Sequence, residues 1–447
     1  MERRDFLTLL AAGAGSMAPL GHAAWAATAP ASQDTRRKLV VVMLRGAADG
    51  LNIVAPVADP DYVQARPTIA LAAPGKDDGA LDLDGYFGLH PALQPLMPLW
   101  RERKLAFVHA CGSLDPTRSH FDAQDYMESA TPGIKSTPDG WMNRLAAALP
   151  GTSTPTRTLS IGPVLPRILA GAAPAVNLAS VASASKAGVL ERPALASGFD
   201  RLYEGHPRYG KAYRDGREAR REVMAAAEAQ PAMQPMAEPN MQADLQATMP
   251  PAMQSGAQPG MQRNLQQEML AANNGAPLPA GFPDDAARLA TLMRSDPNIQ
   301  LAFFALGGWD THAGQGAGTG QLAGRLSPLA LGLAQFARRL GPMFDDTVVV
   351  VMSEFGRTVR ENGNRGTDHG HGNAMWVMGG GVAGGKVLGD WRGLSDGALH
   401  EGRDVPVTTD FRAVLAQVAE QHLRLDARQL AQVFPGLPAG ARLALLG

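Results

Sequence analysis

Six short runs of apolar residues predict the strands of a buried sheet. They cover residues 38–44, 105–109, 158–161, 299–306, 347–352 and 374–378. Each run is continuous rather than alternating, which is typical of parallel strands covered on both faces. Segments with a helical period lie between them, at residues 92–103, 121–130, 142–148, 286–294, 322–340 and 410–420. The alternation predicts an α/β fold with a doubly wound, mostly parallel sheet and helices on both faces.

Residues 223–270 interrupt this pattern. They are rich in Met, Gln, Ala and Pro, and they hold eight of the nineteen methionines. The prolines disfavour one continuous helix, so we interpret the segment as a low-complexity surface excursion. The alternative is a cluster of thioether ligands for Cu(I), which favours soft sulfur. Apart from this excursion, residues 27–447 are expected to form a single α/β domain.

The first 26 residues resemble an export signal. Arg3 and Arg4 precede Asp-Phe-Leu and an apolar stretch, and Ala24 and Ala26 offer the small residues that a signal peptidase requires. An arginine pair followed by Phe-Leu resembles a twin-arginine signal, and an ordinary secretory signal is the alternative. We predict export by the twin-arginine machinery, cleavage by signal peptidase before Ala27, and a periplasmic or secreted protein.

Charge and cysteine content exclude several classes of protein. The 41 basic and 42 acidic residues leave a formal charge of −1 without a basic stripe, so nucleic acid is not an expected partner. The single cysteine, Cys111, excludes an intrachain disulfide framework and is expected to be a buried, inert thiol. No segment after the signal reaches the ~20 apolar residues that a membrane span requires, so no anchor is expected after cleavage.

Candidate chemistry follows four of the predicted strands. The carboxyl ends of parallel strands share one edge of a sheet, so side chains placed there can form one site. The polar clusters are Asp49; Arg118, Ser119 and His120; Asp310 and His312; and Glu354 with Asp368, His369 and His371. We expect these four clusters to lie together.

Two of the clusters have the composition of a metal site. The Gly-rich loop at residues 362–371 carries Asp368, His369 and His371, whose oxygen and nitrogen atoms are ligands that zinc, manganese or iron accept. A solvated polar loop that binds nothing is the alternative. Asp310 and His312 are two residues apart, so in an extended segment they would point to one side and reach the same ion.

Glu354 and the segment 118–120 each have two interpretations. A carboxylate directly after a buried strand is costly without a partner, so Glu354 either binds metal or forms an ion pair with Arg357. Ser119 stands where a helix begins, and is either its N-cap or a metal-activated nucleophile. Arg118 suits bidentate binding of phosphate or sulfate, with an exposed salt bridge as the alternative. His120 is left open between a metal ligand, a hydrogen-bond donor and a loop cap.

Five stretches of the chain resemble the DUF1501 family of exported bacterial proteins. They are residues 44–52 (LRGAADGLN), 118–124 (RSHFDAQ), 308–312 (GWDTH), 353–358 (SEFGRT) and 366–371 (GTDHGH). That family is in turn similar to the alkaline phosphatase and sulfatase superfamily. The resemblance implies a doubly wound α/β core and one or two divalent metals. It implies Ser119 at the nucleophile position, and a metal-binding set of Asp49, Asp310, His312, Glu354, Asp368, His369 and His371.

The chain departs from the superfamily pattern at two points. Glu354-Phe355 stands where an Asp-His pair is usual, and Asp310-x-His312 replaces Asp-x-x-x-His, with Gly314 at the longer spacing. His369 or His371 is expected to supply the missing imidazole. We therefore predict a metal-dependent hydrolase of phosphate or sulfate esters acting on a small-molecule substrate. A non-catalytic metal- or ligand-binding protein of the cell envelope is the alternative.

Overall fold

The computed structural model describes residues 37–151, 154–180, 193–207, 209–228, 272–438 and 442–447. The expected export signal and most of the Met-rich excursion lie outside these residues. Within the described part of the chain, no helix is long and apolar enough to cross a membrane.

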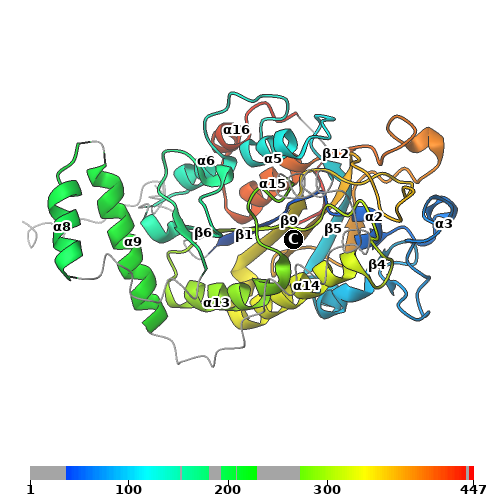
Figure 1. The fold of residues 1–447 in the computed structure, drawn as a ribbon, viewed down its shortest axis with the longest axis horizontal. Coiled ribbons are helices and arrows are strands. Elements are labelled where there is room, and N and C mark those ends of the chain that lie inside the picture. The colour runs from blue at the N-terminus through cyan, green and yellow to red at the C-terminus, as the bar shows by residue number, and fades with distance from the viewer. Residues whose placement is uncertain (1–36, 152–153, 181–192, 208, 229–271, 439–441) are drawn as a thin grey trace, which may run out of the picture. The chain divides into compact units, whose positions relative to one another are not determined.

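A nine-stranded sheet forms the centre of the fold (Figure 1). Its order is β11-β5-β10-β9-β1-β8-β6-β7, and β12 also pairs with β5. The strands are β1 (Lys38–Leu44), β5 (Leu105–Gly112), β6 (Thr158–Ile161), β7 (Val176–Leu178), β8 (Leu301–Leu306), β9 (Thr347–Ser353), β10 (Asn373–Gly379), β11 (Lys386–Leu388) and β12 (Thr409–Asp410). A second, antiparallel sheet has the order β2-β4-β3, with β2 (Val54–Ala55), β3 (Leu81–Asp82) and β4 (Gly88–Leu89).

The main sheet is mixed but mostly parallel. β10 runs antiparallel to both of its neighbours, β5 and β9, and the other pairs of the sheet are parallel. The α/β fold class and the six predicted strands are confirmed. The sequence did not predict β7, β11 and β12, which are two or three residues long and only partly buried.

Helices pack on both faces of the sheet. One face carries η1 (Pro91–Leu96), α4 (Met97–Arg101), α13 (Phe282–Ser295) and α14 (Gln321–Leu340). The other carries α5 (His120–Ser129), α6 (Trp141–Ala148), α15 (Phe411–Gln417), the π-helical turn η8 (Val418–His422) and α16 (Ala427–Val433). Alternate residues of β1 supply the two cores, Val40 and Val42 to the first, Val41 and Met43 to the second.

The remaining helical segments of the described chain lie outside these two groups. They are α2 (Gly50–Ile53), α3 (Pro60–Ala65), η2 (Pro155–Arg157), η3 (Arg167–Leu169), α8 (Pro193–Tyr203), α9 (Gly210–Glu228), η5 (Pro279–Gly281), η6 (Gly341–Asp346) and η7 (Asp396–Ala398). The helix predicted at residues 92–103 is a 3₁₀ segment followed by α4, because Pro95 lies within it and lacks a backbone donor. The helices α8 and α9 were not predicted.

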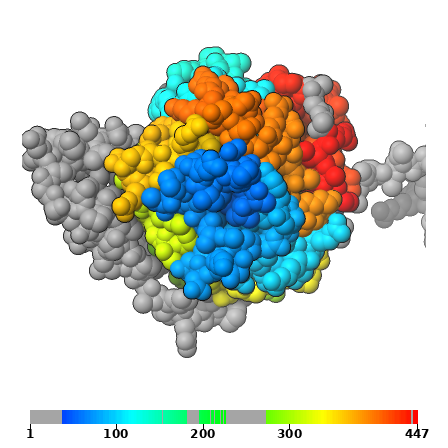
Figure 2. Space-filling model, turned by 90° about the vertical axis from the view of Figure 1, so that its right-hand side faces the viewer, coloured from blue at the N-terminus to red at the C-terminus, as the bar shows by residue number. Residues whose placement is uncertain are grey.

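A third, smaller core joins the α3 region to the later loops. Tyr62 of α3 packs in it with Val359 and Leu394. Figure 2 shows the surface over this core, where the blue segment around α3 lies beside the orange segment near residue 394.

Four chain segments reach the same edge of the sheet. β9, β1 and β8 are adjacent and parallel, so their carboxyl ends lie together. β5 points the same way, because it and β9 are both antiparallel to β10. The residues after these four strands therefore meet at one edge, as the carboxyl-edge argument predicts for α/β folds.

Candidate metal centre

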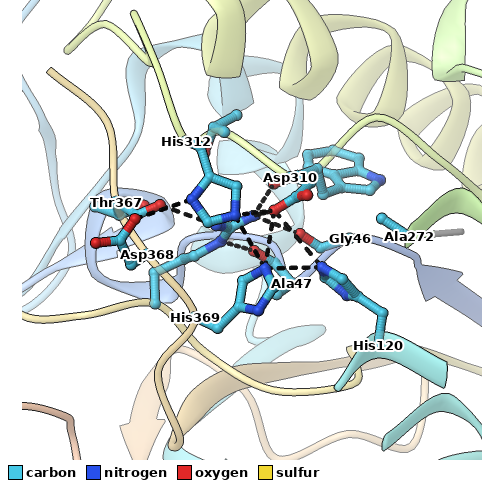
Figure 3. Close-up of polar contacts among 12 residues, drawn as sticks. Gly46, Ala47, His120, Ala272, Asp310, His312, Thr367, Asp368 and His369 are labelled. Atoms are coloured by element: carbon cyan, nitrogen blue, oxygen red, sulfur yellow. Dashed lines mark hydrogen bonds and ion pairs between the residues drawn. The ribbon is translucent and has the colours of Figure 1, made fainter. Parts of the chain in front are cut away.

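Three side chains from three of these segments converge at the carboxyl edge (Figure 3). They are His120, Asp310 and His369, and among the described residues they form a group that could hold a metal ion. The Nε2 atoms of His120 and His369 are 3.0 Å apart, and Asp310 Oδ1 lies 3.6 Å from the first and 3.3 Å from the second. Ligand atoms around a tetrahedral ion with bonds of ~2.0–2.1 Å are about 3.3 Å apart, so this spacing fits an ion.

His312 places a fourth donor beside the group. Its Nε2 lies 3.0 Å from His369 Nε2 and 3.1 Å from Asp310 Oδ1. The side chain is 42 % exposed, whereas those of His120 and Asp310 are 10 % and 11 % exposed. His312 therefore lies on the solvent side of the group.

Each imidazole is oriented by an acceptor at its outer nitrogen. Nδ1 of His120 contacts Glu354 Oε1 at 2.8 Å, and Nδ1 of His312 contacts Asp368 Oδ1 at 3.0 Å. Nδ1 of His369 contacts the backbone carbonyl of Arg118 at 2.9 Å. A carbonyl or carboxylate oxygen accepts, so Nδ1 of each ring carries a proton and Nε2 faces the group, where its lone pair is free once the ring is neutral. This outer hydrogen bond is the arrangement that fixes histidine ligands of metals.

Local structure explains how each ligand reaches the site. His120 is the first residue of α5, directly after the N-cap Ser119. Asp310 and His312 follow β8 through Gly308, whose φ of +92° strongly favours glycine. His369 lies in the connection between β9 and β10 and forms an isolated bridge with Arg357. The segments after β5, β8 and β9 thus supply one candidate ligand each.

Arg357 fastens these loops to one another. Its guanidinium is fully buried and donates to the carbonyls of Gly46, Ala47, Trp309 and Thr367 at 2.7, 2.7, 3.1 and 2.9 Å. It also donates to Asp310 Oδ1. Glu354, for which an ion pair with Arg357 was the alternative, is not its partner in these contacts.

Glu354 lies behind His120 rather than in the group. It is fully buried and accepts from Gly46 N at 2.8 Å, Gln124 Nε2 at 3.0 Å and Ser353 Oγ at 3.0 Å, as well as from His120. Phe355, where relatives were expected to carry histidine, stacks on the His120 ring with centroids 4.9 Å apart. Position 355 thus orients an imidazole instead of providing one.

The site changes the pKa values of its members. Burial alone would lower the pKa of His120, but its contacts with Asp310 and Glu354 raise it to about 9. Burial opposes ionisation of Asp310, yet the three histidines and Arg357 hold its pKa far below the ordinary value. Burial would raise the pKa of Glu354, but His120 above all lowers it to about 2. Contact with Asp310 raises the pKa of His312, whereas burial lowers that of His369.

Asp49 is not brought into the group. Arg66 Nη1 and Nη2 donate to its two oxygens at 2.5 and 3.1 Å, and Gln315 Nε2 donates at 2.7 Å. Both ion-pair partners are completely buried. A charge this deep requires a paired partner, and here Arg66 provides it. Asp49, which was expected to bind metal, instead forms an ion pair with Arg66 that connects the loop after β1 to the end of α3.

His371 also points away from the group. Its Nε2 contacts the carbonyl of Ser113 at 3.1 Å, and its ring packs 4.7 Å from that of His400. Asp368 is 56 % exposed and contacts His312 and Asn362, so it supports a ligand at the rim. Of the seven residues in the expected metal set, Asp310, His312 and His369 lie together with His120.

The residues expected to be catalytic lie beside the group. Ser119 is exposed, and its Oγ accepts from Asp122 N at 3.4 Å as the N-cap of α5. Arg118 forms ion pairs with Glu401 and Asp404, both at 2.7 Å. His120, whose role the sequence left open, supplies a donor atom of the group.

Sequence reasoning missed several supporting residues. Gln124 bridges Arg45 and Glu354, and its place four residues after His120 on one helix face was a usable signal. Arg66 and His400 had no such signal, because they lie in irregular segments without a recognisable spacing.

One comparison identifies the family. The family model described as "Protein of unknown function (DUF1501)" matches residues 36–434, most of the chain, so the protein belongs to this family. No curated protein matches the chain.

Proposed function

We propose that this DUF1501 protein is an exported metal-dependent hydrolase of phosphate or sulfate esters. The observation that carries the proposal is the convergence of His120 Nε2, Asp310 Oδ1 and His369 Nε2 within 3.0–3.6 Å of one another. Catalytic zinc sites use such sets of three protein ligands and leave a position for water or substrate. Imidazole and carboxylate suit zinc, manganese or iron, whereas calcium and magnesium prefer all-oxygen sites.

The chain's residues have distinct roles in this proposal. His120, Asp310 and His369 would hold the ion, with Glu354 and the Arg118 carbonyl fixing the two rings. When bound, a divalent ion would act as a Lewis acid on an ester oxygen and stabilise the charge of the transition state. His312 lies on the solvent side of the group, with its Nε2 3.1 Å from Asp310 Oδ1, so it is placed to give a proton to the leaving oxygen.

Ser119 is the nucleophile of the proposed reaction. It precedes a metal ligand, is exposed, and stands at the N-terminus of a ten-residue helix, whose amide groups favour an anionic substrate. Its Oγ would bond to phosphorus or sulfur and lose its proton to water, while the bond to the leaving oxygen breaks. Water would then release the phosphoryl or sulfuryl group from Ser119.

A specific observation favours a second candidate function. His312 Nε2 lies within 3.1 Å of two of the other donor atoms. A fourth protein ligand would close the coordination shell, which is the arrangement of structural rather than catalytic zinc sites. On this account the protein is a non-catalytic metal- or ligand-binding member of the cell envelope.

Variants of His312 and His369 separate the two candidate functions. The wild-type protein would be assayed for bound metal and for hydrolysis of aryl phosphate and aryl sulfate. We expect His312→Ala to keep its metal and lose turnover, and His369→Ala to lose both. His206→Ala is the matched control, because His206 lies between α8 and α9, which contribute no ligand. Loss of metal from His312→Ala, with an inactive wild-type protein, would establish the second function.

Ser119→Asn tests the nucleophile. Asparagine caps a helix as well as serine does but has no hydroxyl. We expect Ser119→Asn to bind metal and to lose at least about a thousandfold in turnover. Turnover at the wild-type rate would remove Ser119 from the mechanism.

Export is part of the same proposal. The twin-arginine machinery would carry the folded, metal-loaded chain, and signal peptidase would remove residues 1–26. Replacing Arg3 and Arg4 by lysine should leave the precursor in the cytoplasm, whereas normal processing of that variant would favour the general secretory route.

A further inference from the structure

Beside the metal centre, Arg118 is held in a way that points to a regulated anion site. We propose that the carboxylate of Glu401 occupies the place on Arg118 where an oxyanion of the ligand binds, and that the ligand displaces it. The inference rests on the proposed function, because it assigns the residues that recognise the phosphate or sulfate group. The oxyanion would come from the substrate, or from free phosphate or sulfate.

Two carboxylates of different character share the Arg118 guanidinium. Nη2 donates to Glu401 Oε2 and to Asp404 Oδ2, both at 2.7 Å. Asp404 is completely buried and also accepts from Arg403 Nε at 2.9 Å, so it is fixed. The side chain of Glu401 is 59 % exposed. An exposed ion pair contributes little stability, so Glu401 is the partner that an anion replaces at low cost.

Buried polar atoms without partners surround the same place. Among the described residues, Arg118 Nε and His371 Nδ1 have no hydrogen-bond partner, and His400 Nε2 has only the long contact with Glu401 Oε1 at 3.9 Å. His371 is 8 % exposed, and its ring packs against that of His400. Nearly all buried polar groups of folded proteins are hydrogen-bonded, so a cluster of unpaired ones indicates a missing ligand or water. Arg118 Nε and the nearby imidazoles are available to hold an oxyanion.

The backbone at Glu401 is strained. Its φ is +54° and that of Gly402 is +62°, at the tip of a turn in which His400 and Asp404 form a bridge. A left-handed conformation is unfavourable for glutamate and persists where the surrounding structure imposes it. This turn therefore places a carboxylate over Arg118 against the local preference of the residue.

The charges around Arg118, and its position beside His369, also favour an anion there. The two cations Arg118 and Arg403 balance the two anions Glu401 and Asp404, so the cluster is neutral until Glu401 leaves and then carries one positive charge. The Arg118 carbonyl accepts from His369 Nδ1, and Arg403 donates to the His369 carbonyl. An anion on Arg118 would thus lie beside a metal ligand, where a phosphate or sulfate ester must be placed for attack.

Binding of inorganic phosphate and sulfate to the metal-loaded protein tests the proposal by calorimetry. We expect Glu401→Gln to bind phosphate roughly two- to fivefold more tightly, since an exposed competitor has been removed. Arg118→Gln should bind at least about tenfold more weakly. Arg392→Gln is the control, because Arg392 forms an exposed ion pair with Asp390 and should change nothing.

Two outcomes would overturn the proposal. One is wild-type affinity in Arg118→Gln, and the other is unchanged or weaker binding in Glu401→Gln. Metal content and thermal unfolding are measured on each variant, so that a folding defect is recognised. The experiment measures binding rather than turnover. An inactive protein that still shows these affinity changes would therefore contradict the proposed hydrolase and support the anion site. Phosphate and sulfate are each titrated, so their affinities are compared directly.

Discussion

Each imidazole of the candidate metal centre is oriented by the residue that its Nδ1 contacts. For His120 this residue is Glu354, which is fully buried and held by Gly46, Gln124 and Ser353. For His312 it is Asp368, which is largely exposed. A buried carboxylate fixes a ring more firmly than a solvated one. Glu354 should therefore hold His120 more firmly than Asp368 holds His312.

Replacing Glu354 should therefore weaken metal binding more than replacing Asp368. Glu354→Gln keeps the size of the side chain and loses its charge, and we expect a loss of ~10–100-fold in metal affinity. Asp368→Asn should cost less than about tenfold. Competition with a chelating dye measures both, and equal effects would contradict the assigned roles.

The raised pKa of His120 makes the metal-free protein sensitive to alkaline pH. Its pKa is about 9 in the folded protein against 6.5 for a free histidine. A raised pKa contributes stability that is complete below pH 6.5 and is lost as the pH rises through 9, here about 3 kcal/mol. With a chelator present, the unfolding temperature should fall between pH 6.5 and 9.

A bound ion should reduce this dependence. It takes the place of the proton on His120 Nε2, so metal affinity should rise with pH up to about 9. Differential scanning measurements with and without metal test both statements. An unfolding temperature that rises with pH in the metal-free protein would contradict the assignment of His120.

At the residue scale, the sequence indicated the site but not every ligand. Asp310, His312 and His369 were predicted from acids and imidazoles placed after strands. Asp49 fitted the same rule, yet Arg66 neutralises it, and no local pattern shows that an arginine seventeen residues on will be buried there. His120 and Ser119 are adjacent in the sequence, and only the structure shows that His120 lies in the candidate metal group while Ser119 caps the helix.

Helix α5 begins with a residue that caps it and a residue of the candidate metal centre. Ser119 caps it, His120 opens it, and Gln124 and Glu128 lie farther along it, contacting Glu354 and Arg45. A substitution at Ser119 thus affects the helix as well as any reaction.

The cap can be measured separately. Ser119→Ala should lower the free energy of unfolding by ~0.5–2 kcal/mol, because Asp122 N loses its acceptor. Ser119→Asn should stay within a few tenths of a kilocalorie of the wild type. Denaturant unfolding measures both variants. If both lost the same free energy of unfolding, the stability that Ser119 contributes would not come from capping the helix.

At the element scale, strand positions were easier to predict than strand direction. The run at residues 374–378 is apolar throughout because β10 is buried on both faces, and such a run reads the same in either direction. The direction of β10 could have been predicted from the connection that precedes it. That connection has no helical period, and a parallel strand would need a crossover helix there. The helix at residues 92–103 was predicted as one element because its apolar spacing outweighed its prolines.

For the whole molecule, the candidate metal ligands are residues 120, 310 and 369, which are brought together by the assembled sheet. An ion bound there stabilises the folded state and not the unfolded chain. At a hundredfold excess over the dissociation constant, it should add ~2.7 kcal/mol and raise the unfolding temperature by several degrees.

Zinc or manganese added to chelated protein tests this by differential scanning. His369→Ala should show no metal-dependent rise, and His206→Ala should show the full rise. A rise of equal size in His369→Ala would place the ion elsewhere in the molecule.

The antiparallel direction of β10 has a consequence for engineering and for variation among relatives. Since β9 and β10 pair with each other, the connection between them leaves and re-enters the sheet at the same edge. Its length is not fixed by a helix that must cross a face of the sheet. Residues near Asn364 are exposed and are hydrogen-bonded to the segment after His312, so we expect insertions there to alter the candidate site while the sheet stays intact.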